Sequence, residues 1–179
     1  MSVKTLAILG AGDAGIAAAR LAALAGLHVR LWDPSEAALR GALLLVRQLL
    51  EEAVRDGQAP AAHRQTILDG VLATTDLEEA VAGADAVLET GPEAAAVRAD
   101  VLGRAAAADR EAALLASGSL EAVSTLLPDP SRLAGLVLGE RPGEQPPRAA
   151  ACRASSPRAL GAARELAAAL ARAATLGRS

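Results

Sequence analysis

Three glycines near the amino terminus have the spacing of a loop that binds the phosphates of a dinucleotide. The segment Gly10-Ala-Gly12-Asp-Ala-Gly15 follows an apolar stretch at residues 3–9 and leads into a helical pattern. In such a loop the first glycine permits a tight turn, the second admits a pyrophosphate, and the third lets the helix pack on the strand. The helix amino terminus adds N–H donors and a partial positive charge. The predicted phosphate-binding residues are Gly10, Ala11, Gly12, Asp13, Ala14 and Gly15.

A carboxylate follows at the position where an adenosine ribose is recognised. Asp33 lies 18 residues after Gly15, at the end of an apolar stretch at residues 29–32. Its oxygens can accept hydrogen bonds from ribose hydroxyls and would repel a 2′-phosphate, and no arginine follows it. We therefore expect NAD rather than NADP. The alternative is a glycine-rich turn followed by a surface aspartate that caps the next helix.

These residues need a scaffold of alternating strands and helices. Apolar runs at residues 3–9, 29–32, 71–74, 86–88, 112–116 and 133–138 predict strands. Helical patterns lie at 14–24, 36–55, 77–81, 93–108 and 120–127, after Pro60 and from Pro157 onward, with Ser35 and Asp76 as N-caps and Gly26 as a C-cap. Such alternation predicts an α/β fold, a Rossmann-type doubly wound, mainly parallel sheet with helices on both faces.

The overall composition excludes several classes of function. The chain has 179 residues, a net charge of −3, one tryptophan, and neither tyrosine nor phenylalanine, so we expect an Ala/Leu/Val core and no nucleic-acid partner. No apolar segment reaches the roughly 18 residues of a membrane span. The only cysteine, Cys152, can form no disulfide within the chain, and no basic leader precedes the first strand. We expect a cytoplasmic protein without a metal site.

Further segments resemble the NAD-binding domain of the 3-hydroxyacyl-CoA dehydrogenase family. They are residues 74–80 (TTDLEEA), residues 84–89 (ADAVLE) with Pro92-Glu93, Leu115-Ala116-Ser117 with Ser119-Leu120, and residues 132–136 (RLAGL). The resemblance spans about residues 3–170. It implies one domain over residues 1–179, with a helical insertion at about 35–70 and without the family's C-terminal helical domain.

The same resemblance implies further cofactor contacts at the end of the fourth strand. In the family the loop from Glu89 to Glu93 lies beside the nicotinamide ribose, and Arg98 stands where a lysine contacts cofactor or substrate. The implied residues are Thr90, Gly91, Pro92, Glu93 and Arg98. The alternative is that Glu93 and Arg98 only open and decorate an exposed helix.

The residues that should transfer the proton are missing from their expected positions. The family uses a histidine after Gly-Leu, paired with a glutamate, but here Val137 follows Gly135-Leu136. Valine cannot accept the proton that leaves a hydroxyl during its oxidation. Weak substitutes are Ser117, Ser119 and Glu140; the alternative for Glu140 is a solvated loop carboxylate. Both histidines, His28 and His63, are expected at the surface.

Three hypotheses therefore remain. The chain is an oxidoreductase that acts on the 3-hydroxyl of acyl-CoA-type substrates by hydride transfer to NAD, or a non-catalytic NAD(H)-binding regulatory or partner subunit. The third is a Rossmann-shaped interaction protein whose site is no longer used. An Ala/Leu-rich last helix indicates association as a homodimer or with a partner chain.

Overall fold

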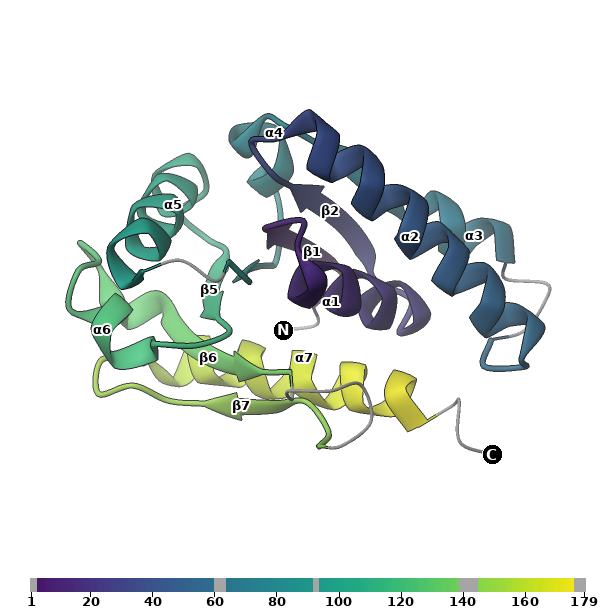
Figure 1. Cartoon of the computed structure of the whole chain (residues 1–179). Helices are drawn as coiled ribbons and strands as arrows, with labels where there is room; N and C mark the ends of the chain where they lie inside the picture. Colours follow the sequence, from purple (N-terminus) through teal and green to yellow (C-terminus); the bar gives the residue numbers. More distant parts are fainter. Residues whose placement is uncertain (1–2, 60–63, 92–93, 139–144, 176–179) are drawn as a thin grey trace.

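A seven-stranded sheet forms the centre of the molecule (Figure 1). The computed structural model describes residues 3–59, 64–91, 94–138 and 145–175. The strand order is β3-β2-β1-β4-β5-β6-β7, and every strand is parallel to its neighbours except β7. The strands are β1 (Thr5–Leu9), β2 (His28–Trp32), β3 (Val71–Thr74), β4 (Ala86–Glu89), β5 (Ala113–Ala116), β6 (Leu133–Val137) and β7 (Arg148–Ala150).

Helices cover both faces of this sheet. Those on one face pack with α1, and those on the other pack with α5. The first group is α1 (Asp13–Leu24), α2 (Glu36–Arg55), α3 (Arg64–Asp69) and α7 (Pro157–Thr175). The second is α4 (Leu77–Val81), α5 (Ala95–Ala108) and α6 (Leu120–Ser124). The predicted Rossmann-type doubly wound fold is thus confirmed.

The core is built from small aliphatic side chains that alternate between the two faces. Along β1, Leu6 and Ile8 point to the α1 side, whereas Ala7 and Leu9 point to the α5 side, and all four are fully or almost fully buried. Both faces are covered, so the central strands are continuously apolar rather than alternating apolar and polar. The expected Ala/Leu/Val core is confirmed.

Most helix ends lie where the sequence places them. The Ser35 hydroxyl accepts a hydrogen bond from the Ala38 N–H at 3.2 Å, and the Asp76 carboxylate accepts two from the start of α4. Gly26 follows α1 with φ +81°, a left-handed conformation that glycine adopts without strain. These caps were predicted from residue type alone, because capping depends on neighbours within one turn.

Helix α6 and strand β7 differ most from the expectation, while β1 begins at Thr5 rather than residue 3 and the short turn η2 was not predicted. Helix α6 ends at Ser124 rather than residue 127, because the hydroxyls of Ser124 and Thr125 bond to carbonyls of the last turn and Pro128 disfavours helix before it. Strand β7 was not predicted. It has three residues and runs antiparallel to β6, so its sequence is too short to show a period.

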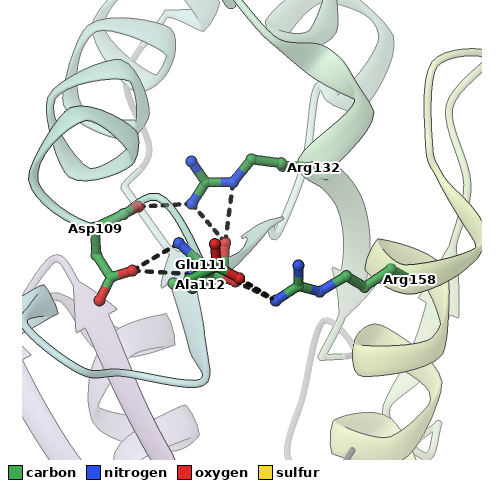
Figure 2. A network of polar contacts seen from close by, with 5 residues as sticks. All are labelled: Asp109, Glu111, Ala112, Arg132 and Arg158. Atoms are coloured by element: carbon green, nitrogen blue, oxygen red, sulfur yellow. Dashed lines mark hydrogen bonds and ion pairs between the residues drawn. The ribbon is translucent and has the colours of Figure 1, made fainter.

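A polar network joins the amino ends of β5 and β6 to α7 (Figure 2), and Gly83 connects it to the segment before β4. Arg132, in the 3₁₀ turn η2 (Pro130–Arg132), donates four hydrogen bonds of 2.7–3.2 Å to the carbonyls of Ala106, Asp109 and Ala112. The Asp109 carboxylate accepts from three backbone N–H groups, those of Gly83, Glu111 and Ala112. Arg158 of α7 pairs with Glu111 at 3.0 Å. We call these residues the amino-edge network.

The amino-edge network shifts the pKa of Asp109. Partial burial raises this pKa, but the N–H donors of Glu111, Gly83 and Ala112, together with the Arg132 charge, outweigh burial. The pKa of Asp109 therefore lies below its ordinary value, and the network favours the ionised carboxylate.

Candidate functional site

A cleft of about 430 Å³ opens at the carboxyl ends of β1, β2 and β4. The chain leaves β1 toward one face of the sheet and β4 toward the other, so this is the topological switch point where α/β sheets bind ligands. The cleft is lined by residues 9–12 after β1, residues 32–34 after β2, residues 89–91 after β4, Ala38 of α2, and Val97, Arg98 and Val101 of α5.

Two of the three motif glycines are required by close packing. Gly10 has φ +115°, and a Cβ there would lie 3.0 Å from the Thr90 hydroxyl oxygen. A Cβ on Gly15 would lie 1.9 Å from the carbonyl oxygen of Gly10, so any side chain at residue 15 would push α1 away from β1. These contacts account for the first and third glycines of the motif.

The second glycine leaves space for a ligand. Apart from its neighbours along the chain, no described atom lies within 4 Å of where a Gly12 Cβ would be. Gly12 both lines the cleft and caps α1 without a side-chain hydrogen bond. The first N–H groups of α1 therefore have no side-chain acceptor from the cap and suit a phosphate oxygen. Asp13 and Ala14, which open α1, are exposed beside the cleft rather than among its lining residues.

Asp33 is held in place by the backbone on both sides of the cleft. One carboxylate oxygen accepts the Ala11 N–H at 3.0 Å, and the other accepts the Ser35 N–H at 2.9 Å. Each ionised oxygen keeps a second lone-pair site, which can accept a hydroxyl hydrogen bond. Asp33 does not cap α2, because the cap is Ser35. The position and hydrogen bonds of the Asp33 carboxylate fit the ribose hydroxyls of a dinucleotide.

The end of β4 forms the floor of the cleft on its other side. The Thr90 hydroxyl donates to the carbonyls of Leu9 and Gly10 at 3.1 and 3.3 Å, which joins β4 to the motif loop. The Gly91 N–H donates to Glu89 Oε1 at 2.6 Å. This loop is therefore fixed by its own side chains. Pro92 and Glu93 lie outside the described residues.

Arg98 is buried, with 9% of its surface exposed. Its Nε lies 3.4 Å from Glu89 Oε2, and its Nη2 donates to the carbonyl of Gly91. The interpretation that Arg98 decorates an exposed helix is therefore wrong. Arg98 lines the cleft from α5, as the resemblance implied, and pairs with a carboxylate that was not among the predicted site residues.

The candidate proton-transfer residues do not form a catalytic pair. Ser117 follows β5 and is half-buried, while Ser119 is exposed with φ +48°. His28 begins β2 at the opposite edge of the sheet and is exposed, as expected. Glu140 and His63 lie outside the described residues. The described lining of the cleft contains no histidine.

Several lining residues were missed in the sequence. They are Leu9, Trp32, Pro34, Ala38, Glu89, Val97 and Val101. Val97 and Val101 are four residues apart on α5, and Val97 is 49% exposed although apolar. That spacing was a usable signal for a helix face toward the cleft. Trp32, the only aromatic residue, donates from Nε1 to the Thr75 carbonyl at 3.0 Å and is buried beside Asp33.

Two further properties of the described residues bear on the site. Within the described ranges, no three His, Cys, Asp or Glu side chains gather as metal ligands would. No helix in the same ranges is long and apolar enough to span a membrane.

Comparisons with known proteins agree with this geometry. Residues 5–136 match the family model described as "3-hydroxyacyl-CoA dehydrogenase, NAD binding domain". A 3-hydroxyadipyl-CoA dehydrogenase of Escherichia coli K12 is 30% identical over 140 residues, which cover 76% of this chain and 29% of that protein. The chain thus spans under a third of the length of that relative.

Solved structures show the same fold. The 3-hydroxybutyryl-CoA dehydrogenase of E. coli K12 superposes with a TM-score of 0.85 at 24% identity, over 95% of this chain and 37% of that one. The (S)-3-hydroxybutyryl-CoA dehydrogenase of Ralstonia eutropha gives 0.84 at 20% identity, over 95% and 62%. With a family match over most of the chain, the protein belongs to the 3-hydroxyacyl-CoA dehydrogenase family, as its NAD-binding domain, and its cofactor is NAD.

Proposed function

We propose that NAD(H) lies along the cleft with its adenosine ribose on Asp33 and its pyrophosphate over Gly12 and the start of α1. The main support is the Asp33 carboxylate, which two backbone N–H groups orient. It lies in the same cleft in which Gly12 leaves space for a ligand. The proposed cofactor-binding residues are Gly10, Ala11, Gly12, Asp13, Ala14, Gly15, Asp33, Thr90, Gly91 and Arg98, together with Pro92 and Glu93.

We further propose that this chain by itself holds the cofactor without oxidising a 3-hydroxyl. Bound NAD supplies hydride acceptance at its nicotinamide, but the reaction also needs a base for the hydroxyl proton. Val137 ends β6 where the family resemblance places that base, and a serine without an adjacent base is a poor proton acceptor. The chain would then be a regulatory or partner subunit.

The second candidate is a dehydrogenase of 3-hydroxyacyl-CoA-type substrates. Family membership favours it, and Ser117 lies at the carboxyl end of β5, on the cleft side of the sheet. In this case a homodimer or a partner chain would complete the site. We also propose a cytoplasmic location, which the free, buried thiol of Cys152 supports.

One titration followed by one assay tests both candidates. Trp32 is the only tryptophan and lines the cleft, so NADH binding should quench its emission by energy transfer. Acetoacetyl-CoA is then added and NADH absorbance is followed. Quenching without loss of absorbance supports the non-catalytic subunit, whereas turnover supports the dehydrogenase. Absence of quenching at saturating NADH would contradict NAD(H) binding in this cleft.

A further inference from the structure

The guanidinium of Arg98 lies between two turns that come from different strands. On one side are Glu89 and Gly91, which follow β4, and on the other is Gly118, which follows β5. A Cβ at residue 118 would lie 3.2 Å from Arg98 Nη1, so the turn packs directly on the charged group. A methyl group at residue 118 would therefore press on Nη1 and displace it slightly.

Arg98 reaches both polar groups of the loop after β4. Its Nη2 donates to the Gly91 carbonyl, while Glu89, with which its Nε is paired, accepts the Gly91 N–H. The peptide groups on both sides of Gly91 are therefore oriented by this buried ion pair. The Ser117 N–H also donates to the Glu89 backbone carbonyl at 3.1 Å. Glu89 is therefore bonded both to the loop after β4 and to the turn after β5.

Stability of the folded chain alone does not explain this arginine. Among the described residues, its buried Nε and Nη1 have no hydrogen-bond acceptor, and the Nε contact with Glu89 is an ion pair only. Buried donors are normally satisfied, so an exception at a cleft is a mark of function.

The sheet order tells which half of the cofactor these turns serve. In this topology a dinucleotide crosses the switch point, with its adenosine over the β2 side and its second nucleotide over the β4 side. Asp33 follows β2, whereas Gly91 and Gly118 follow β4 and β5.

We propose that Arg98 is a positioning residue for the nicotinamide half of the site. It orients the Gly91 peptide and the Glu89 carboxylate and joins them to the turn at residues 117–119, while the adenosine half is independent of it. This inference rests on the proposed binding of NAD(H) in the cleft. Arg98 of α5 would then position the nicotinamide indirectly, through the Gly91 backbone that it orients.

Arg98→Met tests the inference when NADH and ADP are titrated in parallel. Both ligands contain the adenosine and the pyrophosphate, but only NADH has the nicotinamide half. We expect the Kd for NADH to rise about tenfold and that for ADP to change by less than about twofold. The emission of bound NADH should also shift toward that of NADH in water. Arg104→Met, on the exposed face of the same helix, is the matched control and should leave both Kd values unchanged.

A second variant covers the case in which Arg98→Met does not fold. Gly118→Ala adds a methyl group against Nη1 and should weaken NADH several-fold more than ADP, whereas Gly103→Ala, which meets no atom within 4 Å, should not. Equal changes for NADH and ADP in both variants, or no change in either, would overturn this inference alone. Wild-type protein that bound neither ligand would overturn the proposed function and the inference with it.

Discussion

Arg98 and Arg132 lie at opposite edges of one sheet and have opposite surroundings. Arg132, at the amino edge, donates four hydrogen bonds to backbone carbonyls around the end of α5. Figure 2 shows those to Asp109 and Ala112. Arg98, at the carboxyl edge, donates one hydrogen bond, and its buried Nε and Nη1 have no hydrogen-bond acceptor within the part of the chain that the structure describes. Arg98 is buried and Arg132 is half-buried, so the better-bonded arginine is the more exposed of the two.

The difference distinguishes a structural arginine from one that serves a site. Arg132 satisfies carbonyls that α5 and the following turn leave unpaired, and its charge suits the negative end of the helix dipole. Its network is complete without a ligand. Arg98 instead holds the loop after β4 and packs on the turn at Gly118, and both of these segments lie at the carboxyl edge of the sheet, beside the cleft. Changes at the amino edge should therefore alter stability, and changes at the carboxyl edge should alter binding.

Arg132→Met should have the largest effect on stability. It leaves three partly buried backbone carbonyls without their donor, and we expect the free energy of unfolding to fall by about 2–4 kcal/mol. Urea denaturation measures this loss, with Arg172→Met on the exposed face of α7 as the control. The Kd for NADH of the folded variant should not change; a weaker Kd would show that the two edges are coupled.

Asp33→Ala should have the largest effect on binding. It removes a charged acceptor for ribose hydroxyls, so the affinity for NADH should fall by about 1.5–3 kcal/mol, while that for NADPH should fall less, because the repulsion of its 2′-phosphate is also removed. Parallel titrations with the two nucleotides measure the ratio. Equal losses would contradict the assignment of Asp33 to the adenosine ribose.

Asp109→Asn should change stability in a pH-dependent way. The folded state lowers the pKa of Asp109 below its ordinary value of 3.8, so the ionised carboxylate stabilises the fold at higher pH. This contribution is complete above the ordinary value and is lost as the pH falls through the folded-state pKa. At neutral pH we expect a loss of about 1 kcal/mol. Unfolding curves of the two proteins should converge in acid; a constant difference would indicate a steric cause.

Asp13→Asn should have the smallest effect, and in the opposite direction for binding. Asp13 opens α1, where its charge stabilises the helix but opposes a pyrophosphate. We expect NADH to bind about two- to threefold more tightly at low salt and the difference to shrink at high salt. The melting temperature should fall slightly. Weaker NADH binding in the variant would mean that the carboxylate itself contacts the cofactor.

How far the sequence could predict the fold depends on how local each signal was. The caps at Ser35 and Asp76 and the glycine motif were predicted correctly, because each depends on residues within one or two turns of chain. Strand β7 was missed, since three residues show no period and its pairing with β6 is a tertiary event. The site was predicted in part: Asp33 lies where expected, whereas the lining by Trp32 and the pairing of Glu89 with Arg98 were not predicted.

The sequence by itself determined the βαβ unit that ends at Asp33, the strands that are apolar on both faces of the sheet, and the family to which the chain belongs. Local steric and hydrogen-bonding rules act on neighbours along the chain, so spacing is enough to express them. Only the tertiary structure decided that Arg98 is buried against Glu89 and packs on Gly118, and that Arg132 closes the end of α5. These partners are 9 to 26 residues apart or on different strands, and only the parallel sheet brings their ends to a common edge.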